Sequence, residues 1–554
     1  MQHTKINKNK DKLQESLLMG ALASSFGIFI SKVLGLFYYS PLSSIAGEAN
    51  MAFYSIVYTY YDLLLQISSA GIPFAIASLV ASYIGKKDYK TALLVKKLGT
   101  SIVLVLSVVI AFVFILTASP LAKQSLGASA PSYDIESLKT LFYILTVAVI
   151  VVPFLSAIRA YSQGLKRLDI YGASQVLEQL VRVVAIILGA IIFVNVIKLD
   201  NIWAIYAAIG AASLGSIVAI IFTKYFSNDD VKHIEELAKE QDYDANKTNL
   251  EVIKEILSIG VPYLIISFLS TSGPLVNTTF FLDYVTKVHG SSVYESMKLA
   301  SGILQANVAK ISNIPSVLAL GFGSGMVPYL AESLGNNNNE KITQQINSIL
   351  DTTCFILVPM CLIFAVFARD IYFIFYGNNN LDLGANLFAV SVIQIFLGTI
   401  APIFTSIMMS LKLRKPAIVT LIISFIVKLV TFFPLVKSYY AYGMIYSSGI
   451  YYLLQILMCF YFLRLEFNIN VKQAAIRFCL ILLCSIVMIV PAYVLHYLVP
   501  FAYDSRIMDI LMLGGLGIIM LIVYYFITKK SGLLSQILNI KDVSFSSLIA
   551  KFRS

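Results

Sequence analysis

Residues 101–118 read SIVLVLSVVIAFVFILTA, a run of hydrophobic and small residues without a single charge. In a helix that rises about 1.5 Å per residue, such a run nearly crosses the hydrocarbon core of a bilayer, which is about 30 Å thick. Comparable stretches recur along the whole chain of 554 residues. The sequence predicts about fourteen membrane-spanning helices, at approximately 17–43, 51–83, 93–118, 138–158, 170–195, 202–226, 255–282, 300–331, 345–367, 384–410, 416–436, 441–463, 474–498 and 508–528.

The composition supports an all-α polytopic membrane protein. Hydrophobic residues make up 58% of the chain, charged residues only 13%, and the mean hydropathy is +0.81. A soluble protein needs roughly 25% charged residues to cover its surface. The composition therefore excludes a soluble enzyme, a nucleic-acid-binding module and a disordered scaffold. The net charge of +11 fits contact with anionic membrane headgroups rather than with nucleic acid.

The distribution of positive charge predicts the orientation. Most of the 41 lysines and arginines fall in alternate connecting segments, and positively charged loops stay in the cytoplasm. The larger clusters lie at 86–97, 159–167, 224–254 and 412–415. Arg159 is counted with these cytoplasmic segments, and Lys298 with the outer ones. An even number of spans then places both termini in the cytoplasm.

One long polar segment divides the chain. Residues 227–254 contain the run DDVKHIEELAKEQDYDANK, and we expect a partly helical cytoplasmic linker there. The predicted organisation is an N-terminal lobe of six helices at 1–226, this linker, and a C-terminal lobe of six helices at 255–466. Two further helices and a cytoplasmic tail follow at 467–554.

Six ionisable residues fall well inside the predicted spans, where each charge costs about 2.5–3.5 kcal/mol on insertion scales. They are Lys32, Asp62, Glu178, Arg182, Lys310 and Lys428. Glu178 and Arg182 are four residues apart on one helix and can pair. The remaining balance is positive, which favours an anionic substrate, phosphate above all. The alternative for each lysine is a side chain that reaches the membrane interface.

The second predicted span carries a stripe of tyrosines. Tyr54, Tyr58 and Tyr61 are spaced by four and three residues, so they share one helix face. The stripe is either simple packing or a wall of hydroxyl groups that binds a sugar or a phosphate. The five cysteines have neither disulfide nor metal-site spacing, and no cofactor or metal is predicted.

Four segments together resemble a known family: ISKVLGLFYYSPL at 30–42, SSAGIPFAIASLVASY at 68–83, IRAYSQGLKRLDIYGASQVLEQLVRVV at 158–184 and KISNIPSVLALGFGSGMVPYLAES at 310–333. This is the polysaccharide-transporter branch of the multidrug/oligosaccharidyl-lipid/polysaccharide exporter superfamily. Within it, the chain most resembles Gram-positive lipid II flippases of the MurJ type and the stage V sporulation protein B group. The resemblance implies a two-lobe, V-shaped bundle with a central cationic cavity, alternating access, and a lipid-tail groove at the last two helices.

The resemblance also suggests substrate-binding positions. The family's first helix carries a basic residue where this chain has Lys32, and its eighth helix carries one where this chain has Lys310. Both lysines keep the charge but lack the bidentate fork of arginine. Charged positions of the Gram-negative members align with Tyr38, near Gln66 and with Asn313, so this part of the family's charge network is not retained.

The function implied is a flippase that moves an undecaprenyl-pyrophosphate-linked peptidoglycan precursor across the bacterial cell membrane, with roles in cell-wall biogenesis and cell shape. The predicted partners are the lipid-linked oligosaccharide, membrane lipids and possible cell-wall synthesis enzymes. No bond is broken, so no catalytic residue is expected. Three alternatives stay open: a flippase for a capsule or teichoic-acid precursor, a cation-coupled drug exporter that depends on Asp62 or Glu178, and a non-transporting scaffold.

Overall fold

The computed structural model describes residues 34–35, 38–69, 71–241, 247–316, 330, 333–334, 339–467, 471–498 and 505–538. Every regular element in these residues is a helix, which confirms the predicted fold class. The chain divides into two compact units, Met1–Gly302 and Ile303–Ser554. The division predicted from the polar segment at 227–254 differs from this one, and the predicted lobes stay a prediction.

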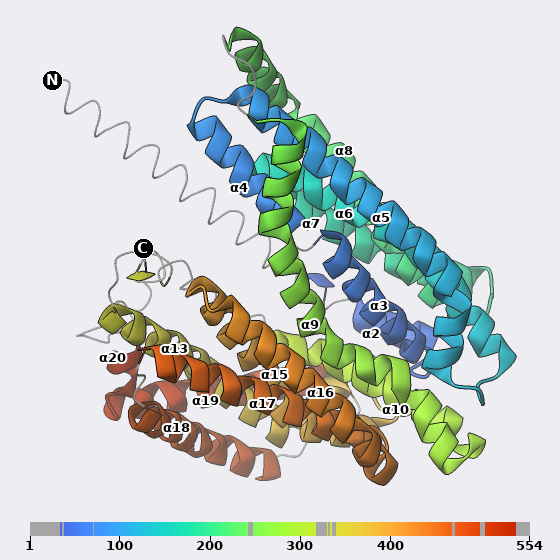
Figure 1. Ribbon diagram of the computed structural model, residues 1–554. Helices are drawn as coiled ribbons and strands as arrows, with labels where there is room; N and C mark the ends of the chain where they lie inside the picture. The colour runs from blue at the N-terminus through green and yellow to red at the C-terminus, as the bar shows by residue number, and fades with distance from the viewer. Residues whose placement is uncertain are drawn as a thin grey trace. The chain divides into compact units, whose positions relative to one another are not determined.

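In its described residues, the N-terminal unit contains six long helices, the shorter α4 and several minor elements (Figure 1). The long helices are α3 (Met51–Ser69), α5 (Tyr89–Leu126), α6 (Ser132–Gly164), α7 (Leu168–Ala190), α8 (Ile202–Glu240), α9 (Asn249–His289) and, shorter, α4 (Ile72–Gly85). The minor elements are α2 (Tyr39–Ala46), the π-helical turn η1 (Ile191–Val196), the 3-10 turn η2 (Ser291–Val293) and α10 (Tyr294–Gly302). Helix α6 packs against α5 and α8, and α7 packs against α8.

The C-terminal unit begins with a π-helical turn and continues as a second helical bundle (Figure 1). Its elements are η3 (Ile303–Val308), α13 (Asn339–Val366), α14 (Ala368–Tyr376), α15 (Leu381–Ser410), α16 (Arg414–Tyr439), α17 (Ala441–Phe467), α18 (Val471–Leu498), α19 (Arg506–Lys530) and α20 (Leu533–Leu538). Helix α17 packs against α15 and α16, and α18 packs against α13 and α19.

Twelve helical segments in the described residues are long and apolar enough to cross a membrane. Each coincides with one predicted span, so the multi-pass membrane protein is confirmed. The two other predicted spans, 17–43 and 300–331, fall largely or partly outside the described residues. The total of fourteen therefore stays a prediction.

Helix α5 shows how these sequences suit a lipid environment. Its small residues Gly99, Ser107 and Ala111 are buried and spaced by multiples of four, so they form one face that lets neighbouring helices approach closely. On the opposite side, Val105 and Leu116 are 63% and 65% exposed. Large apolar side chains on the surface of a bundle are stable where the surrounding medium is hydrocarbon.

The predicted span 51–83 is two helices rather than one. Helix α3 ends at Ser69 and α4 begins at Ile72, with Gly71 at a φ of +80° and Pro73 in the first turn of α4. A Cβ atom on Gly71 would lie 2.5 Å from the carbonyl oxygen of Gly260 in α9. Glycine therefore allows both the left-handed backbone and the close contact between α4 and α9.

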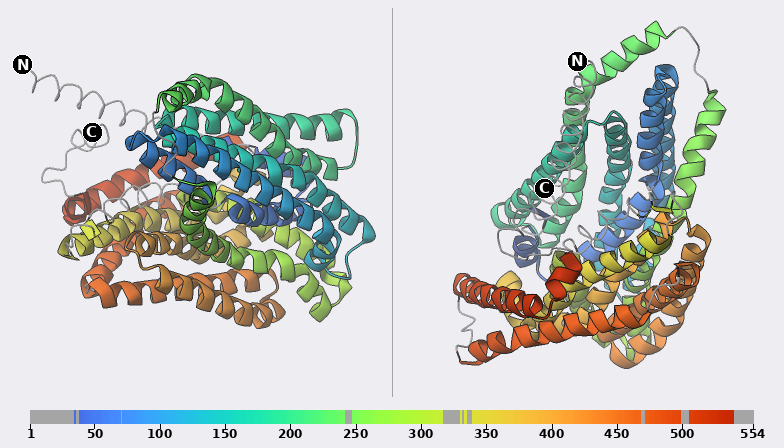
Figure 2. Two further views of the ribbon diagram at one scale, coloured as in Figure 1. Left: turned by 45° about the horizontal axis from the view of Figure 1, so that its top comes forward. Right: turned by 90° about the vertical axis from the view of Figure 1, so that its left-hand side faces the viewer.

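The predicted polar linker is largely a helical extension. Helix α8 continues to Glu240, and its last turns project beyond the neighbouring helices (Figure 2, right). Helix α9 begins at Asn249 with a capping box, in which Thr248 and Glu251 each bond the other's backbone. The prediction of a partly helical segment is thus confirmed for these residues.

Candidate functional site

A ladder of five tyrosines runs through the N-terminal unit. The rings of Tyr38, Tyr39, Tyr54, Tyr58 and Tyr61 contact one another in that order, with centroids 5.3–5.7 Å apart. The predicted stripe on α3 is therefore confirmed, and α2 extends it. Tyr38 and Tyr54 are buried, and their hydroxyl groups are hydrogen-bonded to each other at 2.8 Å. These two hydroxyls hold the ladder together in this conformation.

Beyond the ladder, α3 has a face that is more accessible to solvent or substrate. Tyr58 and Gln66 are half-buried and Asp62 between them is exposed, at successive steps of four residues. Residues at this spacing lie on the same face of a helix. Three of the predicted substrate-binding side chains therefore share one open face, which offers hydroxyl, carboxylate and amide groups.

A buried charge cluster lies on α6 and α7. Glu178 of α7 accepts hydrogen bonds from Nη1 of Arg159 at 2.8 Å and from Nη2 of Arg182 at 2.7 Å. Ser216 of α8 also donates to Glu178, at 3.2 Å, and Nε of Arg159 donates to Ser174 at 2.9 Å. The predicted pair of Glu178 and Arg182 is present, and a second arginine shares the same carboxylate.

Arg159, which the sequence analysis counted with the cytoplasmic charges just after the predicted span 138–158, belongs to this cluster. Helix α6 continues to Gly164, so Arg159 lies inside the helix and is only 7% exposed. Two guanidinium groups against one carboxylate leave this cluster with a net positive charge. In the described part of the chain, Nη2 of Arg159 and Nε of Arg182 have no hydrogen-bond partner. The cluster therefore has both charge and donors to offer.

A small cavity joins the charge cluster to the tyrosine ladder. It has a volume of about 10 Å³, and its lining includes Tyr54, Tyr58 and Tyr61 of α3 together with Arg182 of α7. Such a volume is about the least that can hold one water molecule. The guanidinium of Arg182 therefore faces the ladder across a space no larger than a single small molecule.

The C-terminal unit presents Lys310 and Asn313. Both lie in the helical stretch after η3, with Lys310 half-buried and Asn313 exposed. The turn is fixed by Asn307, whose amide donates to the Tyr372 hydroxyl at 3.3 Å and whose carbonyl accepts from Tyr376 at 3.1 Å. π-Helical turns are frequent at functional sites. This one directly precedes the turn that carries Lys310.

Lys428 differs from Lys310 in its degree of burial. Its side chain is fully buried in the C-terminal unit, where its Nζ atom donates to the hydroxyl groups of Ser447 and Ser448, each at 2.8 Å. The Phe432 ring lies 5.5 Å away. Substrate contact by Lys428 would require this packing between α16 and α17 to open.

The family follows from comparison with known proteins. Residues 17–334 match the model of the polysaccharide biosynthesis protein family, and residues 292–433 match that of the MatE family. The chain belongs to the polysaccharide biosynthesis protein family. The resemblance seen in the four sequence segments is thereby confirmed.

Two known proteins are similar to this chain at low sequence identity but over most of its length. The lipid II flippase MurJ of Bacillus subtilis (strain 168) is 26% identical over 492 residues, which covers 88% of this chain and 90% of that protein. Stage V sporulation protein B of the same organism is 19% identical and covers 69% of this chain and 70% of its own. These relatives agree with the prediction that the chain is not an enzyme.

A solved structure of a lipid II flippase MurJ in the inward closed conformation has the same fold. It superposes with a TM-score of 0.64 at 14% identity, and covers 94% of this chain and 100% of that one. At this level of identity the likeness shows the fold alone. This polysaccharide biosynthesis family member therefore has a polytopic transporter fold.

Lys32 lies outside the described residues, so its predicted role in this family member stays a prediction. Within the part of the chain that the structure describes, no group of histidine, cysteine and acidic side chains could hold a metal ion.

A second buried ion pair was missed by sequence reasoning. Lys298, which was counted with the outer connecting segments, is 5% exposed in α10 and donates to Asp134 of α6 at 2.5 Å. Tyr294 donates to the same carboxylate at 2.8 Å, and Lys298 lies over the Phe53 ring at 4.5 Å. Burial and the neighbouring Asp134 raise the pKa of Tyr294. These contacts fasten α10 to α6 within the N-terminal unit.

Proposed function

We propose that this protein is a flippase that moves a polyprenyl-pyrophosphate-linked glycan of the lipid II class from the inner to the outer leaflet by alternating access. The support from comparison is the lipid II flippase MurJ of Bacillus subtilis, which is similar over 88% of this chain. The bacterial cell membrane is the corresponding location, with both termini in the cytoplasm.

The observation that carries the proposal is the positive excess at membrane depth. Arg159 and Arg182 share the single carboxylate of Glu178, and both lie in helices long and apolar enough to cross a membrane. A charge at membrane depth costs several kcal/mol unless a partner, a substrate or water meets it. A diphosphate, with its delocalised negative charge, is the chemical partner that guanidinium groups bind most directionally.

The remaining predicted side chains suit the rest of such a substrate. Tyr58, Asp62 and Gln66 offer donors and acceptors at the spacing of one helix face, and sugar hydroxyls bind both kinds of group. In the C-terminal unit, Lys310 supplies a further positive charge and Asn313 supplies an amide group. We propose that the two arginines of the cluster, together with Lys32 and Lys310, supply the positive charge that meets the phosphates, and that the α3 face contacts the sugars.

The proposed process moves the headgroup without breaking a bond. The polyprenyl chain stays in hydrocarbon, because transferring it through water would forfeit about 0.8 kcal/mol for each CH₂ group. The headgroup exchanges hydration for the cationic and hydroxyl groups above, and returns to water on the other side. The membrane potential is a source of work, since one charge moved through 100 mV gains about 2.3 kcal/mol.

A cation-coupled drug exporter is the second candidate, favoured by the match of residues 292–433 to the MatE family. A cationic substrate needs an accessible carboxylate at membrane depth. Glu178 is occupied by two arginines, which leaves Asp62 as the residue on which this activity would depend. Asp62→Asn should abolish drug efflux if the exporter is correct, and should leave a flippase with reduced rather than lost function.

The test uses a strain depleted of its own flippase. Lys310→Glu should abolish complementation while the protein stays in the membrane, and Lys310→Arg should retain it, because phosphate binding needs a cation at that position. Lipid II exposed on the outer leaflet is measured directly after depletion. Full complementation by Lys310→Glu would refute the role of this lysine. Accumulation of a capsule or teichoic-acid precursor in place of lipid II would assign a different glycan.

A further inference from the structure

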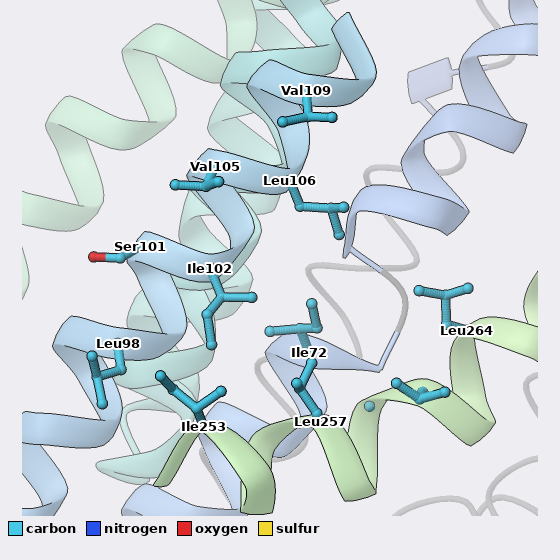
Figure 3. Close-up of a pocket in the computed structure, with 12 residues that line it drawn as sticks. Ile72, Leu98, Ser101, Ile102, Val105, Leu106, Val109, Ile253, Leu257 and Leu264 are labelled. Carbon is cyan, nitrogen blue, oxygen red and sulfur yellow. The ribbon is translucent and has the colours of Figure 1, made fainter. Parts of the chain in front are cut away.

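An open apolar groove lies between α5 and α9 in the N-terminal unit. Its volume is about 590 Å³, and the labelled side chains Leu98 and Val109 of α5, Ile253 and Leu264 of α9, and Ile72 of α4 line it (Figure 3). Among its lining residues, Ser101 has the only polar side chain. The charge cluster and the tyrosine ladder contribute nothing to this groove.

The groove opens to the surface at membrane depth. Val105, Leu257 and Val261 on its walls are 63%, 39% and 43% exposed. Both helices are apolar and long enough to span the bilayer. Apolar walls offer water no hydrogen bonds, so a hydrocarbon chain fills such a groove.

The two helices come together at one end of the groove. A Cβ atom on Gly99 would lie 3.7 Å from the side chain of Ile256, which brings α5 and α9 into contact there. Leu98 and Ile253 lie at this end, and the helices diverge from it toward Val109 and Leu264 (Figure 3). This narrow end is the one that the sequence predicts to be cytoplasmic.

Two lysines mark the narrow end. Lys97 and Lys254 directly adjoin Leu98 and Ile253 in sequence, and both are exposed. Lys97 lies one helical turn before Ser101 and two before Val105, on the same face of α5.

Two acidic residues of α9 lie near Lys254, and both have other hydrogen-bond partners while Glu251 also interacts electrostatically with Lys254. Glu251 caps the helix through Thr248, while Glu255 accepts a hydrogen bond from Tyr83 at 2.6 Å and pairs with Lys247 at 3.2 Å. The exposed ammonium groups of Lys97 and Lys254 are the cations that this end offers to a phosphate.

We infer that this groove binds an anionic diacyl phospholipid, with an acyl chain along α5 and α9 and its phosphate at Lys97 and Lys254. A flipping substrate does not suit the site, because a headgroup held by two lysines at the membrane surface stays on one side. The chain of the bound lipid contacts Ile72, next to the break between α3 and α4. The lipid therefore supports the contact of α4 with α9 at Gly71 and Gly260.

The test measures lipid selectivity at one position. The protein has a single tryptophan, so Trp203→Phe gives a background free of tryptophan fluorescence. Leu257→Trp then places a reporter on the groove wall. Phe268→Trp is the matched control on α9, since both original side chains are 39% exposed and only Leu257 lines the groove. Purified variants are reconstituted in phosphatidylcholine vesicles that contain increasing amounts of phosphatidylglycerol. In one series the phosphatidylglycerol carries brominated chains, which quench tryptophan fluorescence, and in a second series the phosphatidylcholine carries them.

At about 1 kcal/mol for each lysine, the expected preference for phosphatidylglycerol at Leu257→Trp is about 30-fold, with none at Phe268→Trp. Lys97→Gln combined with Lys254→Gln should remove the preference. Lys232→Gln combined with Lys239→Gln, on the exposed end of α8, should leave it unchanged. Equal selectivity at the two reporters, or a preference that survives loss of Lys97 and Lys254, overturns the inference. Displacement of brominated phosphatidylglycerol by equimolar polyprenyl phosphate overturns the assignment to a phospholipid.

Discussion

Glu178→Gln should destabilise the protein far more than Arg182→Gln. Glu178 is the carboxylate that Arg159 and Arg182 share, and the two arginine side chains are 9% and 14% exposed. Removing one partner of a buried ion pair costs about 3–5 kcal/mol, because the other charge stays buried without compensation. Glu178→Gln leaves two such charges. Arg182→Gln leaves the pair of Arg159 and Glu178 intact, so its cost is that of one charged hydrogen bond, about 1.5–3 kcal/mol at most.

Thermal unfolding of the purified protein measures this difference. At about 2–4 °C for each kcal/mol in a large domain, Glu178→Gln should lower the apparent Tm by roughly 6–20 °C. Arg182→Gln should lower it much less. The double variant Glu178→Gln with Arg182→Gln should be more stable than Glu178→Gln alone, because one unpaired charge is removed. Equal losses for the two single variants, or additive losses in the double variant, would refute the reasoning.

Two further predictions concern the other buried groups. Lys428→Met should leave the apparent Tm unchanged or raise it, since a methionine fills similar space without a buried amine. The variant should also retain complementation. Loss of both stability and complementation would contradict this prediction. Burial and Asp134 raise the pKa of Tyr294, so the neutral phenol is favoured in the folded state and its contribution is lost as pH rises above about 10. The apparent Tm of the unmodified protein should therefore fall more steeply between about pH 9 and 11 than that of Tyr294→Phe, and equal slopes would count against this contact.

The membrane spans could be predicted because the length of an apolar segment in a helix can be compared directly with the thickness of the bilayer. The expected span 416–436 lies within α16 (Arg414–Tyr439), and 508–528 lies within α19 (Arg506–Lys530). The break between α3 and α4 was not predicted, since a continuous apolar segment has the same hydropathy whether the helix is straight or broken. Its cause is the close approach of Gly71 to Gly260, a contact between residues far apart in sequence.

The candidate site was predictable where its geometry is local. The tyrosine stripe on α3 and the pair of Glu178 and Arg182 follow from helix periodicity alone. The partners of Arg159 and Lys298 were not predicted, because a charge near the end of an apolar run does not show which distant residue meets it. Lys298 finds its partner Asp134 on α6, 164 residues earlier in the chain. Such pairings depend on tertiary packing.

The burial of Lys428 has a consequence for biogenesis. Ser447 and Ser448, which accept its hydrogen bonds, are synthesised 19 and 20 residues later and belong to the following helix. When α16 leaves the translocon alone, its ammonium group faces lipid at a cost of about 2.5–3.5 kcal/mol. We expect the two segments to enter the bilayer as a hairpin, in which the hydroxyl groups of α17 reach the ammonium group before α16 moves into lipid.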